Sequence, residues 1–123
     1  MKLLVPKEGD SVFVHTASES FFEELLKAGV EIYRYEKGFV HAKTFVIDGE
    51  VASVGTANLD ARSFDLNFEV NALVYNKEVA SDLRRIFYKD LEDASLLRLE
   101  AWEKRSKFKQ LIERIVRLFS PFL

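Results

Sequence analysis

The stretch that decides the fold reads Phe39-Val40-His41-Ala42-Lys43-Thr44-Phe45-Val46-Ile47-Asp48-Gly49-Glu50-Val51-Ala52-Ser53-Val54. Apolar and β-branched residues dominate both halves, and Asp48-Gly49 between them is a strong hairpin-turn signal. The sequence therefore predicts two antiparallel strands, 39–47 and 51–54, joined by a tight turn. Because side chains two positions apart share a strand face, His41 and Lys43 are expected to project together.

Further strands and helices surround this hairpin. Strands are predicted at 2–5, 30–35 and 67–75, with a loop over 6–11 after the first of them. Apolar residues recur at helical spacing over 16–28 and 77–89, and Gly29 ends the first of these helices. A loop is predicted from residue 55 to about residue 64. Strands that alternate with helices predict an α/β or α+β fold with a mixed β-sheet flanked by helices.

Composition excludes several classes of protein. The 123 residues fit one domain. The chain has no cysteine, which excludes disulfide frameworks and cysteine-ligated metals. A net charge of −2 argues against nucleic acid as a partner of the whole domain, because nucleic-acid-binding domains are usually strongly basic.

The charge is unevenly distributed along the chain. Residues 98–123 carry seven basic and three acidic residues, a net charge of +4, which leaves −6 for the other 97 residues. This predicts a domain at 1–97 and a basic amphipathic C-terminal helix at 98–123. The helix carries apolar residues at helical spacing: Leu111, Ile112, Ile115, Leu118 and Phe119. It is interpreted either as an interfacial helix on anionic lipid, with Trp102 among its apolar residues, or as a helix packed on protein.

The candidate site begins with His41 and Lys43. A histidine and a lysine together on an apolar strand are costly to bury unless an anion such as phosphate meets them. Histidine can act as nucleophile or acid and base near neutral pH, and lysine holds phosphate as a point charge. The segment 55–58 adds hydroxyl and amide donors, and Glu69 could hold the far ring nitrogen of His41. From spacing alone, a polar strand edge with a solvated lysine explains these residues equally well.

A longer pattern resolves this choice. His41-x-Lys43-x4-Asp48-x6-Gly55-Thr56-x-Asn58 resembles the HKD motif of the phospholipase D superfamily in residue type and spacing. The flanking segments 28–35, 38–43, 53–64 and 66–70, and the closing segment 118–123, resemble bacterial cardiolipin synthase. The resemblance covers essentially the whole chain and matches the second, C-terminal motif half of that enzyme. It implies a phospholipase D-like mixed sheet flanked by helices.

The resemblance also implies a mechanism that needs no metal or cofactor. One motif histidine attacks the phosphodiester phosphorus to form a phosphohistidine, and the histidine of a second motif protonates the leaving alcohol. His41 is one of these two histidines. Lys43 and Asn58 would neutralise phosphate oxygens, together with Thr56, which stands where the family usually has serine.

Other motif positions receive supporting roles. Glu69 matches the family carboxylate that hydrogen-bonds the motif histidine. Asp48 belongs to the motif, but its place in the hairpin turn favours a structural role. Gly55 is expected to permit close approach of the backbone, and Arg62 and Asp65 to form a supporting ion pair.

The chain contains one HKD motif, whereas the family site needs two. His15 lies in no second motif and is interpreted as a packed or surface histidine. The chain is therefore interpreted as an excised half-domain, possibly truncated at its N-terminus, or as a homodimer with two His41 residues across one site.

The implied reaction joins two phosphatidylglycerols into cardiolipin and glycerol. It is placed at the cytoplasmic face of the bacterial cell membrane, with peripheral contact through 100–123 or an anchor outside this chain. A single-motif homodimeric phosphodiesterase or nuclease, and a non-catalytic module that binds anionic lipid, are the alternatives.

Overall fold

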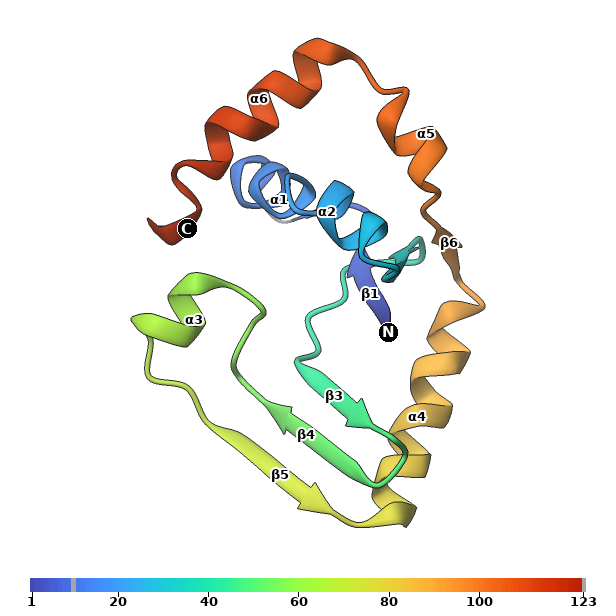
Figure 1. The fold of residues 1–123 in the computed structure, drawn as a ribbon. Helices are drawn as coiled ribbons and strands as arrows, with labels where there is room; N and C mark the ends of the chain where they lie inside the picture. The colour runs from blue at the N-terminus through green and yellow to red at the C-terminus, as the bar shows by residue number, and fades with distance from the viewer. Residues whose placement is uncertain (10, 123) are drawn as a thin grey trace. The chain divides into compact units, whose positions relative to one another are not determined.

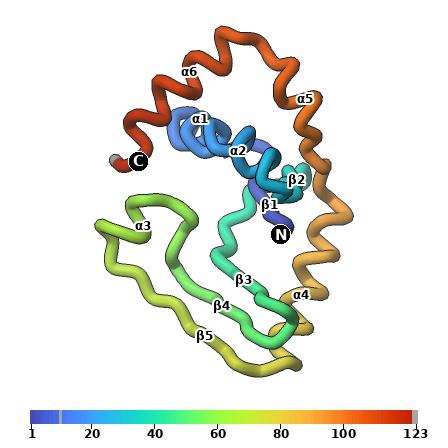
Figure 2. The backbone as a smooth tube through the Cα atoms, in the orientation of Figure 1, coloured from blue at the N-terminus to red at the C-terminus, as the bar shows by residue number. Residues whose placement is uncertain are grey.

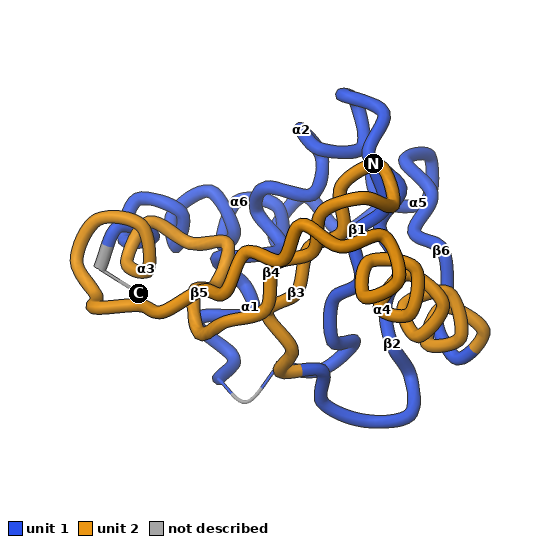
Figure 3. The backbone as a smooth tube through the Cα atoms, turned by 90° about the horizontal axis from the view of Figure 1, so that it is seen from below, with its two compact units in different colours: residues 1–40, 93–123 blue, residues 41–92 orange. Residues whose placement is uncertain are grey.

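The computed structural model describes residues 1–9 and 11–122 (Figure 1). Asp10, in the predicted loop 6–11, and Leu123, at the end of the predicted tail, lie outside the described residues. The chain forms two compact units (Figure 3): unit 1 contains residues 1–40 and 93–123, and unit 2 contains residues 41–92. The predicted boundary between residues 97 and 98 falls within unit 1 and stays a prediction.

Unit 1 combines elements from the two ends of the chain. The first part contributes β1 (Lys2–Pro6), α1 (Val12–Glu19), α2 (Phe22–Lys27) and β2 (Glu31–Tyr35). The second contributes β6 (Ala94–Leu96), α5 (Leu99–Glu103), α6 (Lys107–Arg117) and the 3₁₀ turn η1 (Ser120–Phe122). The sheet has the order β1-β2-β6, with β1 parallel and β6 antiparallel to β2. This sheet is mixed, as predicted.

The core of unit 1 is built from three buried side chains: Phe22 of α2, Ile32 of β2 and Trp102 of α5. Ile32 is completely buried, and the rings of Phe22 and Trp102 lie 5.4 Å apart at 42°. Burying a side chain of this size is worth about 1.5–3 kcal/mol. Residues from both ends of the chain therefore stabilise a single core.

Unit 2 is an antiparallel meander with one long helix. It contains β3 (Thr44–Ile47), β4 (Val51–Gly55), α3 (Ala61–Asp65), β5 (Asn71–Tyr75) and α4 (Lys77–Leu91). The sheet has the order β3-β4-β5, and Figure 2 shows these strands side by side. Helix α4 packs against all three strands, and Ala52 of β4 and Ala80 of α4 are completely buried.

The predicted hairpin turn is confirmed. Asp48 and Gly49 both have left-handed backbone, with φ of 52° and 70°, and the Glu50 N–H donates to the Ile47 carbonyl at 3.0 Å. Two successive positive φ values are what a type I′ turn requires, and aspartate followed by glycine tolerates them well. Beyond the turn, β3 and β4 pair in the register in which Ile47 lies opposite Val51.

Several elements differ from their predicted bounds. The strands form two small sheets instead of one, and β3 and β5 are shorter than the predicted strands 39–47 and 67–75. The predicted helix 16–28 is two helices, α1 and α2, and α1 begins at Val12, before the predicted start. The Ser20 hydroxyl donates to the Ala17 carbonyl at 2.5 Å where α1 ends. The predicted loop 55–64 contains the start of α3, which Asp60 caps by accepting from the Ser63 N–H at 2.6 Å. The predicted C-terminal amphipathic helix is α6, and the short α5 precedes it.

Candidate functional site

All six predicted site residues lie in unit 2, and five of them come from segments next to one end of its sheet. His41 and Lys43 immediately precede β3, Thr56 and Asn58 follow β4, and Glu69 precedes β5. Because β3 and β5 both run antiparallel to β4, the start of each lies beside the end of β4. The topology therefore brings these five residues toward one edge.

Hydrogen bonds continue the ladder beyond the regular strands at this edge. The Gly55 N–H donates to the Lys43 carbonyl at 3.1 Å, and Gly55 pairs with Asn71 of β5. One step further, the Thr56 N–H donates to the Val70 carbonyl at 3.0 Å, and the Val70 N–H donates to the Thr56 hydroxyl at 3.0 Å. These hydrogen bonds hold the backbone segments before β3, after β4 and before β5 together at the end of the sheet where the candidate site residues lie.

Gly55 is required by this close approach. A Cβ at this position would overlap the backbone carbonyl oxygen of Val70 and the side-chain amide of Asn71. The predicted close approach of backbone at Gly55 is confirmed, and its cause is the neighbouring strand.

Glu69 organises the polar side chains of the site. The Thr56 hydroxyl donates to Glu69 Oε2 at 2.5 Å, and the Asn67 amide donates to Oε1 at 3.3 Å. The Thr56 hydroxyl is the main cause that lowers the pKa of Glu69, and hydrogen bonds from Ser63 and Asn67 and the charge of Lys43 lower it further. Glu69 is therefore a carboxylate at neutral pH. Its predicted hydrogen bond to His41 stays a prediction.

His41 and Lys43 are coupled through the backbone. The Lys43 ammonium donates to the His41 carbonyl at 2.9 Å. The His41 side chain is exposed, and Lys43 is half-buried. The segments at this edge thus carry an imidazole, an ammonium, a hydroxyl and an amide, the kinds of group that bind phosphate in proteins.

Asp48 lies away from this edge. It sits in the turn at the opposite end of β3, five residues from Lys43, a span of about 17 Å along an extended strand. The geometry supports a structural role for Asp48 in the turn and no contact with a phosphate held by Lys43.

The predicted ion pair between Arg62 and Asp65 is wrong. Arg62 instead donates from Nε to the Asn67 amide oxygen at 3.2 Å, and these two described residues share no ion pair. Asn67 thereby connects Arg62 to Glu69. Arg62 and Asp65 both lie in α3, and the partner that Arg62 takes there is Asn67.

Ser63 is a site residue that the sequence interpretation did not single out. It is 6% exposed, its hydroxyl accepts from the Asn58 N–H at 3.2 Å, and it also hydrogen-bonds Glu69. The available signal was Asp60-x-x-Ser63, the spacing of a helix cap. Ser63 fixes the backbone of Asn58 relative to the carboxylate.

Two further properties concern the described chain as a whole. Within residues 1–9 and 11–122, no cluster of three or more histidine, aspartate and glutamate side chains is arranged to hold a metal ion. Each helix in the same residues is too short or too polar to cross a membrane.

The fold is a mixed α/β fold, and segments with a histidine, a lysine, a hydroxyl and an amide meet at one edge of a sheet. The family model described as "Cardiolipin synthase, PLD-like domain" matches residues 1–91. The chain belongs to this family of cardiolipin synthases with a phospholipase D-like domain. This confirms both the resemblance inferred from the HKD motif and the predicted fold class.

Known relatives agree over the full chain. All 123 residues align at 50% identity with a cardiolipin synthase of Geobacillus kaustophilus (strain HTA426), covering 24% of that protein. Identity is 47% with a cardiolipin synthase of Clostridium perfringens (strain SM101 / Type A), covering 26% of it, and 46% with cardiolipin synthase 2 of Bacillus anthracis, covering 24%. The chain thus spans about a quarter of the length of the curated relatives it matches.

Proposed function

We propose that the chain supplies one half of the active site, with one of its two HKD motifs, in a phosphatidyltransferase of the cardiolipin synthase type. It transfers a phosphatidyl group from one phosphatidylglycerol to a second one, which yields cardiolipin and glycerol. The observation that carries this proposal is the convergence of the HKD residues His41, Lys43 and Thr56 at one sheet edge, with Glu69 hydrogen-bonded to Thr56.

The chemical step uses two histidines. A ring nitrogen of one histidine attacks the phosphorus, the bond from phosphorus to the glycerol oxygen breaks, and the other histidine gives its proton to that oxygen. The hydroxyl of the second phosphatidylglycerol then attacks the phosphohistidine and returns a proton to the other histidine, while the P–N bond breaks. His41 takes one of these roles, and a histidine of a second HKD motif takes the other.

The remaining site residues stabilise charge and hold His41. Lys43 and Asn58 neutralise the non-bridging oxygens of the phosphate as negative charge develops on them. Thr56 adds a hydroxyl at the same edge, and Glu69 orients the histidine. Asp48 acts on the site only through the hairpin turn that sets the position of β3.

The second motif is supplied either by another part of a longer chain or by a second copy of this one. The short span of the chain relative to its relatives supports the first arrangement. The molar mass in solution tests this choice. A monomer without activity is expected, whereas a stable dimer that makes cardiolipin by itself would establish the homodimer.

The reaction is placed at the cytoplasmic face of a bacterial cell membrane, since both substrates are membrane lipids. Residues 1–97 form the catalytic half-domain in this proposal. Residues 98–123 form its basic tail, and 100–123 make peripheral contact with the membrane. The +4 charge of the tail supports contact with anionic lipid.

A chimera tests the function directly. The 123 residues replace the matching segment of the Geobacillus kaustophilus relative, and the product is assayed in detergent micelles with fluorescent phosphatidylglycerol and thin-layer separation. We expect cardiolipin and glycerol, with His41→Ala lowering the rate at least about 10³-fold and Asn58→Ala about 10²-fold. Asp48→Asn is the matched motif control outside the phosphate contact and should lower the rate far less.

Other products would point to the alternatives. Nicking of plasmid DNA by the chain, lost in His41→Ala, would establish a nuclease. A folded chimera that binds phosphatidylglycerol but transfers nothing would contradict the transferase and favour a lipid-binding module.

A further inference from the structure

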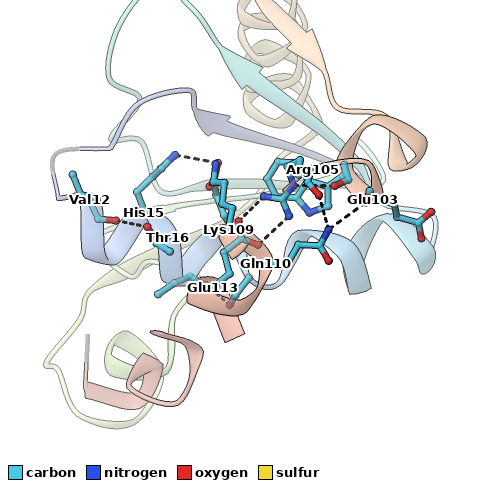
Figure 4. A network of polar contacts seen from close by, with 12 residues as sticks. Val12, His15, Thr16, Glu103, Arg105, Lys109, Gln110 and Glu113 are labelled. Carbon is cyan, nitrogen blue, oxygen red and sulfur yellow. Dashed lines mark hydrogen bonds and ion pairs between the residues drawn. The ribbon is translucent and has the colours of Figure 1, made fainter. Parts of the chain in front are cut away.

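Helix α6 meets the rest of unit 1 with its polar side. Glu113 is 4% exposed and pairs with Arg105 through two hydrogen bonds of 2.5 and 2.9 Å. Lys109 pairs with Glu19 of α1 at 3.2 Å. Figure 4 shows this network of polar contacts between the helices.

A second ion pair fixes the end of the helix. Arg117 binds Glu24 of α2 through two hydrogen bonds of 2.6 and 3.0 Å. Val116 is the one apolar residue of α6 that is buried, at 7% exposure. The inner side of α6 therefore consists mainly of charged groups that are paired within unit 1.

The apolar side of α6 is exposed as a consequence. Residues at 100° intervals around a helix place the apolar set opposite Glu113. Each side chain of this set is between 40% and 75% exposed: Phe108, Leu111, Ile112, Ile115, Leu118 and Phe119. An amphipathic helix of a globular domain normally turns its apolar side to the core, so the orientation of α6 is inverted.

Helix α1 enlarges the same surface. It contacts α6, and its first turn exposes Val12 and Phe13. The rings of Phe13 and Phe119 lie 6.4 Å apart, which connects the two contributions. A contiguous apolar surface of this kind marks a binding surface for lipid or protein. We name it the α6 surface: the six exposed apolar residues of 108–119 with Val12 and Phe13.

The charge around the α6 surface selects its partner. Lys104, Lys107 and Arg114 are exposed and form none of the ion pairs found among the described residues. Of the acids nearby, Glu113 pairs with Arg105, and Glu103 shares Lys27 with Glu23 at 3.4 Å and 2.6 Å. Exposed cations that form no ion pair beside an exposed apolar side fit an anionic, partly apolar partner, which a bilayer of acidic phospholipid provides.

We propose that the α6 surface lies on an anionic membrane, with the axis of α6 parallel to the bilayer. The apolar residues enter the boundary between headgroups and acyl chains, and Lys104, Lys107 and Arg114 lie among the headgroups. Trp102 takes no part, because it is buried in the core of unit 1 at 3% exposure. The inference rests on the proposed function for its lipid class, since phosphatidylglycerol is there both substrate and membrane component.

The absence of cysteine permits a direct test of orientation. Leu111→Cys and Ile115→Cys each introduce the single thiol of the chain, to which an environment-sensitive fluorophore is attached. Ser81→Cys, on the exposed side of α4, is the matched control. The His41→Ala chain is used throughout, so that turnover plays no part.

The probes are read on two kinds of vesicle. Vesicles of equal parts phosphatidylglycerol and phosphatidylcholine should shift the emission at positions 111 and 115 to shorter wavelength and leave position 81 unchanged. Phosphatidylcholine vesicles should bind far more weakly. Unshifted probes on bound protein would overturn the proposal, as would probes already shielded without lipid, which would identify a protein contact as the occupant.

Two variants measure the apolar and the electrostatic contributions to vesicle binding separately. Leu111→Asn with Ile115→Asn should weaken vesicle binding about 30-fold, since each residue has only about half of its side chain left to bury. Replacing Lys104, Lys107 and Arg114 with glutamine should weaken binding about 100-fold at low salt and much less at high salt. Unchanged binding in both variants would overturn the proposal.

The transferase chimera separates this proposal from the proposed function. Loss of vesicle binding with intact transfer in detergent micelles would support the α6 surface and the transferase together. Vesicle binding without any transfer in micelles would refute the transferase alone.

Discussion

The buried ion pair between Arg105 and Glu113 should contribute much more to stability than the exposed one between Arg117 and Glu24. Both are bidentate and both involve α6 or the turn before it. The side chains of Arg105 and Glu113 are 16% and 5% exposed, against 36% and 65% for Arg117 and Glu24. Removing one partner of a buried pair leaves a charge without compensation, whereas solvent compensates an exposed one.

The contacts of Arg105 set the expected loss of stability in Glu113→Ala. In Glu113→Ala the Arg105 guanidinium keeps its bond to the Trp102 carbonyl and its position over the Trp102 ring, so we take the lower end of the usual cost, about 3 kcal/mol. Glu24→Ala should cost much less, because solvent compensates the charge that Arg117 is left with. At a urea dependence of about 1.5 kcal/mol per M, the unfolding midpoint falls by about 2 M in the Glu113→Ala variant and by far less in the Glu24→Ala variant.

Trp102 is the assay for this comparison. It is the single tryptophan, it is buried, and it belongs to the core of unit 1, so its fluorescence follows unfolding of that unit. Circular dichroism should give the same midpoints. The variant that combines Arg105→Ala with Glu113→Ala should cost less than the sum of the two single changes. Equal shifts for Glu113→Ala and Glu24→Ala would refute the argument from burial.

Three further changes test unit 2. Thr56→Val removes the main cause of the low pKa of Glu69 and should raise that pKa toward the ordinary value of a glutamate, read from the carboxyl signal in an NMR titration. An unchanged pKa would contradict the assigned hydrogen bond. The pKa of Glu69 is lower in the folded than in the unfolded chain, so its contribution to stability is complete above about pH 4.3. This contribution is lost as the pH falls through the folded pKa. Unfolding midpoints should therefore decline less below about pH 4 in Thr56→Val than in the parent chain. Gly55→Ala should destabilise unit 2 by about 1–3 kcal/mol through overlap with the Val70 carbonyl, and thermal unfolding with no loss would show that the strands move apart freely. Asp48→Val should cost about 1–2 kcal/mol in urea unfolding because its φ is 52°, whereas Asp48→Asn should cost far less; equal costs would rule out backbone strain as the reason.

Local signals predicted the parts of the fold that depend on neighbours in sequence. The turn at Asp48-Gly49, the strand before Tyr35 and the helix from Lys77 were all located correctly. Pairing between distant strands has no such signal. The assembly of β1, β2 and β6 into a sheet of their own depends on contacts between chain ends that periodicity cannot detect.

In the candidate site too, some features were predictable from the sequence and others were visible only in the structure. Residue types, spacing and the family resemblance predicted site roles for His41, Lys43, Thr56, Asn58 and Glu69, and the topology supports their convergence. The buried Ser63 was missed because a lone serine in a loop segment resembles any other helix cap. For α6, periodicity predicted an apolar stripe but could not indicate which side meets protein, since the buried ion pair of Glu113 reverses the usual preference.

The order in which the elements of unit 1 occur along the chain has a consequence for synthesis. Residues 41–92 are contiguous, so unit 2 can fold as soon as it leaves the ribosome, while the first forty residues wait for β6 and α5. Until Trp102 emerges, the core around Phe22 and Ile32 is incomplete and presents apolar surface to chaperones and to other nascent chains. A premature stop near residue 92 should therefore leave a normal second unit attached to an aggregation-prone first one.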